Sequence, residues 1–374
     1  MASKVLFCAS TYSHICNFHL PYLKMFRDAG WQTHVACAGA ETDIPWADAV
    51  IHLPFRKAMT APGNLWAAAK LRRQIRAERY DLVITHTSLA AFFTRLAMLG
   101  WKRRPVVVNM VHGYLFDDRT GPAKRRLLLA AERLTAPVTD LVLTMNRQDY
   151  EIARRYRLAD RVEEIPGVGV DFEKMCADKA RDRDSLRRDA GIAQDAFVLF
   201  YAAELSKRKS QQVLIRAMAH LPECVVLVLA GEGAMGEYYR GLARRMGIHH
   251  RVILPGHVSD VGRWYAAADA VAASSRSEGL PFNIMEAMHC GVPVVASEVK
   301  GHTDLICHGE TGLLYPYGDC TACAQAVQRL MDDPELARKL GANARERAAE
   351  YGIDSVGKLV FHKYISCVKQ PAEV

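Results

Sequence analysis

The sequence lacks the long uninterrupted apolar run that a membrane-spanning helix needs. Such a helix takes about 20 consecutive apolar residues, and here Arg95 interrupts one candidate run while Glu132, Arg133 and Asp140 interrupt another. A secretory signal is not indicated either, because Lys4 precedes a short apolar run that leads directly into a strand pattern. We therefore expect no transmembrane segment, and a cytoplasmic location.

The sequence also lacks a cysteine framework, although it contains 10 cysteines. Cys320 and Cys323 form a C-x-x-C pair with Cys307 and His308 nearby, but no second pair exists, so no metal site is expected. The cysteines are scattered, which favours a reduced cytosol. Several fall within predicted strands, where a thiol acts as a small apolar group: Cys8, Cys37 and Cys224.

A Gly-x-Gly-x-x-Gly turn is missing after the first predicted strand, where the chain reads Ala9-Ser-Thr-Tyr-Ser-His14. That turn is the phosphate-binding signature of nicotinamide oxidoreductases. Its absence argues against an enzyme of that class.

The pattern that is present alternates strand-like and helix-like segments along the whole chain. This alternation is typical of βαβ units with parallel sheets, and 374 residues that are 50% hydrophobic can fill two cores. The predicted strands are residues 5–9, 33–36, 82–85, 106–110 and 141–144, then 198–201, 225–230, 271–273 and 292–296. The sequence predicts an α/β protein with two doubly wound, Rossmann-like domains.

The domain boundary is expected near Val170. The segment 165–171 is rich in glycine and proline and precedes a charged stretch at 174–189, a pattern typical of a linker and a first helix. This gives an N-terminal domain of residues 1–170 and a C-terminal domain of residues 171–352.

The excess positive charge lies in the first part of the chain. Residues 1–150 carry 20 Lys and Arg against 11 Asp and Glu, whereas the remainder carries 29 against 30. Three basic clusters, at 70–76, 102–104 and 124–126, lie beside apolar helical stretches, a pattern that suits anionic lipid headgroups. Solvated helix faces explain the clusters equally well. Nucleic acid is not expected as a partner, because no nucleic-acid-binding motif accompanies the charge.

The most informative segment carries two carboxylates at a loop-to-helix junction. Glu278 precedes a turn made by Gly279 and Pro281, and Glu286 follows one to two turns inside the helix that is predicted to begin near Pro281 and to end at Gly291. The segment lies between two buried strands, at the carboxyl end of one of them, where open α/β sheets bind ligands. The unpaired N–H groups at the helix start suit phosphate or sugar hydroxyls.

This spacing of Glu278 and Glu286 resembles the paired-glutamate signature of retaining glycosyltransferases of family 4, which share the two-domain GT-B fold. Other segments follow in the family's order: Leu229-Ala-Gly-Glu-Gly233, Ile253-Leu-Pro-Gly-His-Val258 and Val111-His-Gly-Tyr114. The start of the chain, residues 4–23, is similar to members that build bacterial exopolysaccharide or capsule.

The resemblance implies a metal-independent transferase that uses a nucleotide sugar. A missing Asp-x-Asp pair in the predicted donor loop fits this implication. By the same resemblance, the expected donor is a UDP-sugar. A helix at 353–374 should cross back to the N-terminal domain, and the two domains should face a cleft. The donor-binding residues implied are Glu204, Arg208, Gly231, Gly233, Gly256, Val258, Gly279, Leu280, Phe282, Asn283 and Glu286.

Three residues are the candidates for catalysis: His112, Lys209 and Glu278. Lys209 would stabilise the departing diphosphate, and Glu278 would hold sugar hydroxyls while Glu286 accepts ribose hydroxyls. His112 follows a predicted strand, a position that fits a structural histidine or, by the resemblance, a contact with the donor sugar. No cofactor is expected.

The phosphate site departs from the family pattern. Many members have Arg five residues before the Lys that Lys209 matches, whereas Glu204 stands there in this sequence. Arg208 or Lys207 then supplies the second charge. This matters because guanidinium grips phosphate through two bonds and ammonium does not.

The acceptor is expected to approach the loop at 11–19, along Ser13, His14 and Asn17. This loop lacks the paired glycines of many relatives. The acceptor implied is lipid-linked or a glycan, and the enzyme would be peripheral on the inner face of the plasma membrane. Two alternatives stay open: a catalytically silent nucleotide-sugar-binding partner subunit, which Glu204 motivates, and an isomerase or phosphorylase on the same fold. The sequence names neither the sugar nor the linkage.

Overall fold

The computed structural model describes residues 2–39, 43–117, 120–175 and 179–368. The chain divides into two compact units, which we describe separately. The N-terminal unit comprises Met1–Gly169 and Ile353–Val374, and the C-terminal unit comprises Val170–Gly352.

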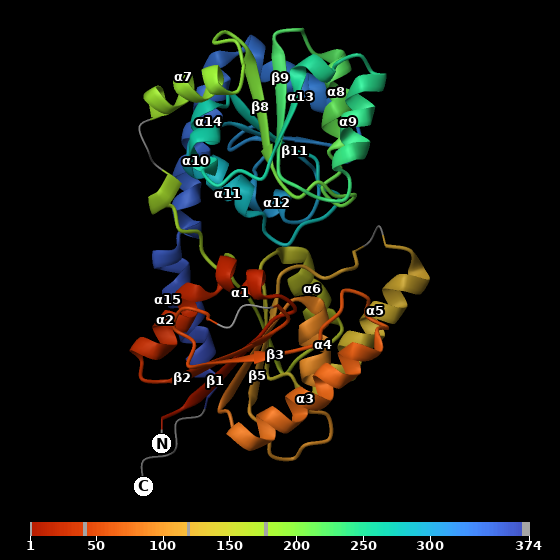
Figure 1. The fold of residues 1–374 in the computed structure, drawn as a ribbon, viewed down its shortest axis with the longest axis vertical. Helices are drawn as coiled ribbons and strands as arrows, with labels where there is room; N and C mark the ends of the chain where they lie inside the picture. The colour runs from red at the N-terminus through yellow and green to blue at the C-terminus, as the bar shows by residue number, and fades with distance from the viewer. Residues whose placement is uncertain (1, 40–42, 118–119, 176–178, 369–374) are drawn as a thin grey trace. The chain divides into compact units, whose positions relative to one another are not determined.

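The N-terminal unit is built on a seven-stranded parallel sheet with the strand order β3-β2-β1-β4-β5-β6-β7. Helices cover both faces of the sheet (Figure 1). Its strands are β1 (Lys4–Cys8), β2 (Gln32–Cys37), β3 (Ala49–His52), β4 (Leu82–His86), β5 (Val106–Val111), β6 (Leu141–Thr144) and β7 (Arg161–Glu164). Its helices are α1 (Tyr12–Phe18), α2 (Leu20–Asp28), α3 (Pro62–Glu78), α4 (Ser88–Leu96), α5 (Pro122–Thr135), α6 (Arg147–Arg155) and α15 (Ile353–Ser366), with a 3-10 turn at Ala136–Val138.

The C-terminal unit repeats this architecture with a six-stranded parallel sheet of order β10-β9-β8-β11-β12-β13. Its strands are β8 (Phe197–Ala202), β9 (Val225–Ala230), β10 (Val252–Gly256), β11 (Ala270–Ala273), β12 (Val294–Ser297) and β13 (Leu313–Tyr315). Its α-helices are α7 (Lys179–Asp189), α8 (Gln212–Ala217), α9 (Gly236–Arg245), α10 (Val261–Ala267), α11 (Phe282–His289), α12 (His302–Leu305), α13 (Cys320–Asp332) and α14 (Pro334–Ala348). Its 3-10 turns are Glu173–Met175, Met218–His220, His249–Arg251 and Ala349–Tyr351.

Both sheets reverse their winding direction beside the first strand of the unit. In the N-terminal unit the reversal lies between β1 and β4, and in the C-terminal unit it lies between β8 and β11. At such a point the loops on either side diverge and leave a crevice at the carboxyl ends of the strands, which is where doubly wound folds bind ligands. The predicted α/β class with two Rossmann-like domains is confirmed.

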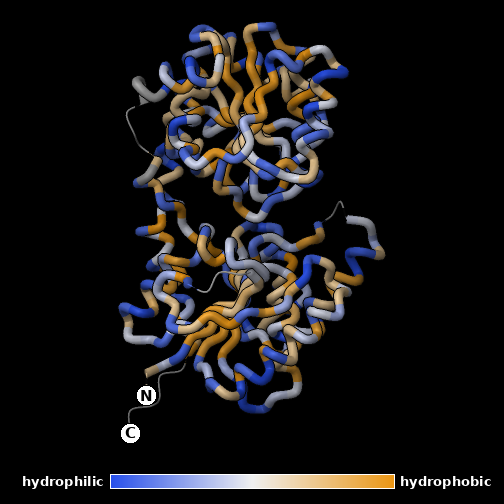
Figure 2. Tube along the Cα trace, in the orientation of Figure 1, coloured by the Kyte–Doolittle hydropathy of each residue, from blue (hydrophilic) through white to orange (hydrophobic). Residues whose placement is uncertain are grey.

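Burial explains why the strands read as continuous apolar runs. The central strands are covered on both faces, so side chains of both faces must be apolar, as in β1, where Val5 to Cys8 are fully buried. Figure 2 shows the strands of each unit as its most hydrophobic part.

Helix α15 belongs to the N-terminal unit although it ends the described chain. It packs on α2, where the ring of Phe361 lies 4.9 Å from that of Phe26, and Tyr364 is fully buried. Gly357 permits this approach, because a Cβ there would lie 2.8 Å from Cε of Met25.

One cysteine prediction is wrong. Cys224 is exposed and lies in the turn before β9 rather than in the strand, whereas Cys8 and Cys37 are buried strand residues as predicted. Strand β9 begins at Val225, one residue after Cys224.

Candidate functional site

The carboxyl edge of the C-terminal sheet gathers the polar residues that the sequence singled out. The segments that follow β8 and β11 meet at the reversal point of the sheet and are tied together by hydrogen bonds. Ser274 Oγ donates to the Lys209 carbonyl at 2.8 Å, and the Arg276 backbone N–H donates to the Arg208 carbonyl at 2.8 Å. Glu278 is therefore held beside the cations of the β8 segment.

Glu278 lies between two cations. Its Oε2 accepts a hydrogen bond from Nη1 of Arg208 at 2.6 Å, and its Oε1 lies 2.7 Å from Nζ of Lys209. Ser275 Oγ also donates to Oε1 at 2.5 Å. The carboxylate is therefore oriented by charge and by hydrogen bonding together.

The electrostatics of this group follow from its burial and its partners. The side chains of Glu278 and Lys209 are 7% and 12% exposed, whereas that of Arg208 is 51% exposed. Burial by itself raises the pKa of Glu278, but Lys209 and Arg208 outweigh it and lower the pKa to about 2. At neutral pH the Glu278 carboxyl is therefore ionised.

The two candidates for the second cation, Arg208 and Lys207, differ in their contacts in the structure. Arg208 contacts Glu278, while Lys207 and Glu204 are exposed. The Glu204 carbonyl accepts a hydrogen bond from Nε2 of Gln211, which fixes the backbone of this segment. The guanidinium at the site thus comes from Arg208, four residues after the position where many relatives carry Arg.

The loop after Glu278 is clamped by the loop after β12. The Glu278 N–H donates to the Lys300 carbonyl at 3.3 Å, and Gly301, with φ of 83°, has no room for a side chain. A Cβ there would lie 2.7 Å from the Gly279 carbonyl oxygen. This close approach holds the turn in which Leu280 is buried and Phe282 begins α11.

Glu286 lies on α11 and is hydrogen-bonded at 2.8 Å by the hydroxyl of Tyr265, from α10. The same hydroxyl lies 3.0 Å from the Asn283 carbonyl. Burial raises the pKa of Glu286, and the Tyr265 hydrogen bond opposes that rise in part. Nδ2 of Asn283 is buried and has no hydrogen-bond partner among the described residues, so it is a donor that a ligand can satisfy.

Gly231 and Gly233 follow β9 and allow its loop to approach the β8 segment. A Cβ at Gly231 would lie 2.1 Å from the Ala203 carbonyl oxygen, and one at Gly233 would lie 2.4 Å from that of Leu205. The Gly231 N–H donates to the carbonyl of Gly256, the last residue of β10. Val258, two residues further, is half-buried.

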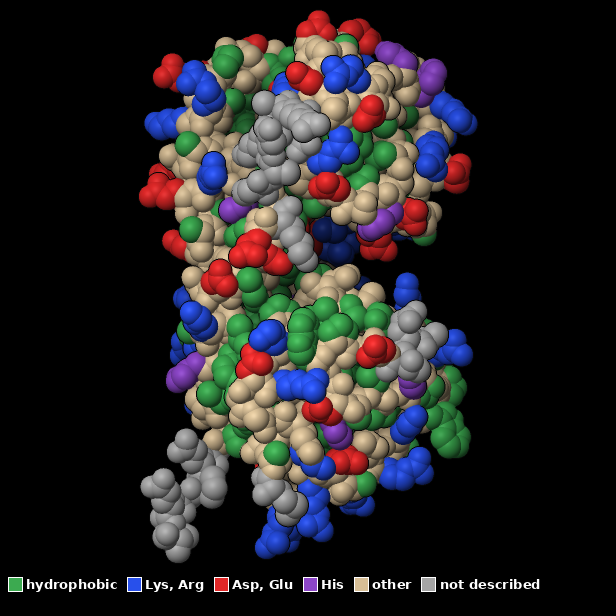
Figure 3. Space-filling model, turned by 60° about the vertical axis from the view of Figure 1, so that its left-hand side comes forward, with side chains coloured by type: hydrophobic (Ala, Val, Ile, Leu, Met, Phe, Trp, Pro, Cys, Tyr) green, Lys and Arg blue, Asp and Glu red, His purple; other side chains and the backbone are tan. Residues whose placement is uncertain are grey.

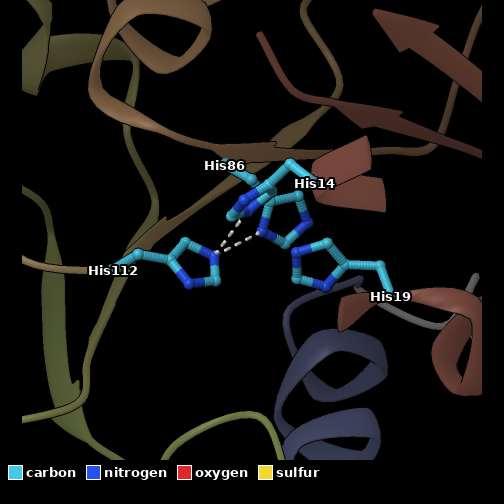
Figure 4. Close-up of side chains that lie close together, drawn as sticks. All are labelled: His14, His19, His86 and His112. Carbon is cyan, nitrogen blue, oxygen red and sulfur yellow. Dashed lines mark hydrogen bonds between the residues drawn. The ribbon is translucent and has the colours of Figure 1, made fainter. Parts of the chain in front are cut away.

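The N-terminal unit gathers histidines at the corresponding edge of its sheet. His112 follows β5 directly, and its Nε2 lies 3.4 Å from Nε2 of His14 and 3.2 Å from Nδ1 of His86. His19, between α1 and α2, stacks on His86 with ring centroids 3.7 Å apart. Figure 4 shows the four rings pointing toward one another. We call these four residues the histidine cluster.

All four members of the histidine cluster have lowered pKa values. Burial lowers the pKa of His14 to about 4, and it lowers the pKa of His86, His112 and His19 well below the ordinary value, with help from the neighbouring rings. At neutral pH the cluster is therefore uncharged.

The segment 11–19, which was expected to be a loop, is helix α1 with Thr11 as its N-cap, and the other acceptor-side candidates lie on the surface of this helix. Ser13 and Asn17 are exposed, and Ser13 Oγ donates to Oγ1 of Thr11, the N-cap of the helix. A cavity of about 210 Å³ lies beside His112, lined by residues that include Thr87, Asn109 and Glu132.

Several site residues were not predicted from the sequence. Ser275 and Tyr265 orient the two glutamates, and Gly301 clamps the loop. His19 and His86 join His112 from distant segments. For Ser275, adjacency to Glu278 at the end of a strand was an available signal.

Two of the basic clusters of the N-terminal unit, at 70–76 and 102–104, form a surface rich in arginine. Arg72 and Arg76 lie over the ring of Trp101, with 4.9 and 4.7 Å to its centroid, beside a hollow of about 540 Å³ that Arg103 and Arg104 also line. Figure 3 shows Lys and Arg side chains gathered along the lower edge of this unit. Large apolar side chains are exposed on α3 and α5: Leu65, Trp66, Leu127 and Leu134.

Within the described part of the chain, none of the helices combines the length and the apolar character needed to cross a membrane.

Two family models match the chain, one in each half. The model described as "Glycosyl transferase 4-like domain" matches residues 21–167, and "Glycosyl transferases group 1" matches residues 182–347. The putative glycosyltransferase EpsD of Bacillus subtilis (strain 168) is 36% identical over 357 residues, which are 94% of this chain and 93% of that protein. A D-inositol 3-phosphate glycosyltransferase of Xylanimonas cellulosilytica is 29% identical and covers 83% of this chain and 78% of its own.

Solved structures share the fold at low identity. Anabaena Alr3699/HepE, crystallised in complex with UDP and glucose, superposes with a TM-score of 0.81 at 22% identity, over 97% of this chain and 100% of that chain. WaaG, a glycosyltransferase involved in lipopolysaccharide biosynthesis, gives a TM-score of 0.79 at 19% identity, over 96% and 99%. The chain therefore belongs to glycosyltransferase family 4 and is a glycosyltransferase enzyme with the GT-B fold.

Proposed function

We propose that this enzyme transfers a sugar from a UDP-sugar, with retention of anomeric configuration, to a lipid-linked or polysaccharide acceptor in the synthesis of bacterial surface glycan. The observation that carries the proposal is the group formed by Arg208, Lys209 and Glu278 at the reversal point of the C-terminal sheet. The likeness to WaaG, a glycosyltransferase involved in lipopolysaccharide biosynthesis, supports the glycan pathway, and the UDP bound to Alr3699/HepE supports the nucleotide.

The two cations are suited to stabilise a departing diphosphate. Negative charge develops on the leaving group as the glycosidic bond breaks, and preorganised cations that face it lower the barrier. Arg208 can offer phosphate oxygens two parallel N–H donors, while Lys209 supplies a point charge. Glu278 holds both cations in place before the donor binds, so little reorganisation is required.

Glu278 also keeps capacity for a sugar hydroxyl. An ionised carboxylate has about four acceptor directions, and Arg208, Lys209 and Ser275 use three of them. The remaining direction, on Oε2, can accept a hydroxyl of the donor sugar. The residue therefore combines orientation of the cations with a contact to the sugar.

Glu286 and Asn283 are proposed to bind the ribose and the adjoining part of the nucleotide. The Tyr265 hydroxyl occupies one oxygen of Glu286, which leaves the other to accept ribose hydroxyls. Nδ2 of Asn283 offers an unpaired donor beside it. The glycines at 231, 233 and 256 shape the backbone of this region.

The roles of the N-terminal unit are proposed from its chemistry. His112 would contact the donor sugar, and Ser13, His14 and Asn17 would line the path of the acceptor. The arginine-rich surface beside Trp101 suits a membrane with anionic headgroups. The exposed Trp66 lies on α3, the helix that also carries Arg72 and Arg76. We propose peripheral attachment to the cytoplasmic face on this ground.

A calorimetric titration with UDP tests the donor site. We expect Lys209→Ala to weaken UDP binding about 10- to 100-fold, since a hydrogen bond to a charged group contributes about 1.5 to 3 kcal/mol. Lys207→Ala is the matched control, because Lys207 is exposed and two residues away. Equal UDP affinity in the Lys209→Ala and Lys207→Ala variants would show that the diphosphate does not bind at Lys209.

The silent partner subunit is the alternative, and Glu204 is the observation that favours it. A protein of that kind would bind UDP with the same dependence on Lys209 but would not release UDP from any UDP-sugar. Turnover, rather than affinity, separates the two functions.

A further inference from the structure

The histidine cluster offers one ring nitrogen from each of four residues in a small volume. His14 comes from α1, His19 from the junction of α1 and α2, His86 from the end of β4 and His112 from the residue after β5. One nitrogen of each ring lies within 4.8 Å of the corresponding nitrogen of every other ring. Figure 4 shows the four rings close together, with the ring of His112 facing those of His14 and His86.

The short distances match those between the ligands of a tetrahedral metal ion. A zinc-like ion at 2.0 to 2.1 Å from four nitrogens places those nitrogens about 3.3 to 3.4 Å apart. His112 Nε2 lies 3.4 Å from His14 Nε2 and 3.2 Å from His86 Nδ1. The remaining pairs lie somewhat further apart, and rotation of the side chains can close that difference.

Hydrogen bonding among the rings does not satisfy the histidine cluster. His112 Nε2 has a single lone pair or a single proton, yet it faces a nitrogen of both His14 and His86. Both nitrogens of the buried His19 have no hydrogen-bond partner in the described residues, and a bound ion would satisfy one of them. Buried polar atoms without partners are unfavourable and point to a missing ligand.

We propose that His14, His19, His86 and His112 bind one divalent transition-metal ion, with Zn²⁺ as the expected species. Four neutral imidazoles suit zinc, copper, nickel or cobalt, whereas Mg²⁺ and Ca²⁺ require oxygen ligands, which the cluster does not supply. His14 and His112 are half-buried, while His19 and His86 are buried.

Metal binding would have two consequences in the N-terminal unit. It would tie the α1–α2 segment to the ends of β4 and β5, across the reversal point of the sheet. It would also occupy Nε2 of His112, so that the contact with the donor sugar proposed above would be made through Nδ1 of the same ring. The proposal does not depend on the proposed function, because it requires neither a nucleotide nor a sugar.

The test uses the full-length chain without a polyhistidine tag, stripped of metal with a chelator and titrated with Co²⁺. A tetrahedral nitrogen site gives cobalt an intense visible absorption, which an octahedral aqueous or surface-bound ion does not. We expect saturation at one Co²⁺ per chain and loss of the band when one equivalent of Zn²⁺ displaces the cobalt.

The variants are His19→Asn and His86→Asn, each measured separately. Loss of one ligand should weaken metal binding at least about 100-fold, since even loss of an outer-shell partner costs 10- to 100-fold. The double variant H249N/H250N is the control, because these neighbouring exposed histidines are the competing surface site. Circular dichroism tests whether each variant is folded.

The proposal is supported if the absorption band is stoichiometric, persists in H249N/H250N and disappears in both cluster variants while they remain folded. It is overturned if the parent protein shows no tetrahedral band at saturating cobalt, or if the band depends on His249 and His250. If either His19→Asn or His86→Asn does not fold, the absorption band of the other variant tests the proposal.

Discussion

Replacement of Glu278 by glutamine tests the electrostatic description of the donor site. The pKa of Glu278 is lowered from 4.5 to about 2, and each pKa unit corresponds to about 1.4 kcal/mol. The shift therefore sets a ceiling of about 3 kcal/mol on the stability that ionisation of this carboxyl provides. Because Arg208 is half exposed and its attraction is screened by solvent, we expect Glu278→Gln to lower the free energy of unfolding at pH 7 by about 2 kcal/mol.

The dependence on pH has a defined sign. A carboxyl whose pKa is lowered by folding stabilises the protein above its unfolded pKa, and this contribution is lost as the pH falls through its folded pKa. The difference between parent and E278Q should thus be nearly constant from pH 7 to about 5 and should fall to less than half at about pH 3.

Urea unfolding of the full chain measures this difference, with amide hydrogen exchange in β8 and β11 as the reporter for the C-terminal unit. Glu346→Gln is the matched control, because Glu346 is exposed on α14 of the same unit. The reasoning is refuted if E278Q and E346Q are equally stable at pH 7, or if their difference does not shrink in acid.

Three further predictions concern packing and hydrogen bonding. Gly231→Ala should destabilise the C-terminal unit by more than about 3 kcal/mol in urea unfolding, because its Cβ would lie 2.1 Å from a carbonyl oxygen, whereas Gly318→Ala, with open space and φ of 88°, should cost about 1 kcal/mol. Tyr265→Phe should weaken UDP binding several-fold in calorimetry, by removing the hydroxyl that orients Glu286. Arg95→Met should lower the free energy of unfolding by about 3 to 5 kcal/mol, because it leaves the Glu132 carboxylate buried without its 2.8 Å partner; equal stability of parent and variant would contradict this.

Sequence reasoning located the segments that have strong local patterns. Helix α11 begins at Phe282 and its C-cap residue is Cys290, close to the predicted limits, because Pro281 and Gly291 break regular structure on either side. The central strands were predicted because each of them is a local run of apolar residues. Strands β3, β7, β10 and β13 were not predicted. Strand β7 lacks a strand signal because Arg161–Glu164 is polar, lies at the sheet edge and carries no apolar run.

The contacts of the site were less accessible to the sequence. Glu278 was singled out from its spacing to Glu286, yet its salt bridges to Arg208 and Lys209 join segments about 70 residues apart. The choice between Arg208 and Lys207 depended on side-chain direction, which adjacent residues in a loop do not reveal. The four histidines of the cluster lie at or after the ends of β1, β4 and β5. These strands are distant in sequence, and they become neighbours only through the strand order of the sheet.

The most direct test of the central claim is release of UDP from a panel of UDP-sugars by the purified enzyme, with and without extracted bacterial lipid acceptors. The account predicts release from one UDP-sugar, increased by lipid, abolished in Lys209→Ala and preserved in Lys207→Ala. Binding of UDP without release from any UDP-sugar, even with lipid present, would contradict it and favour the silent partner subunit.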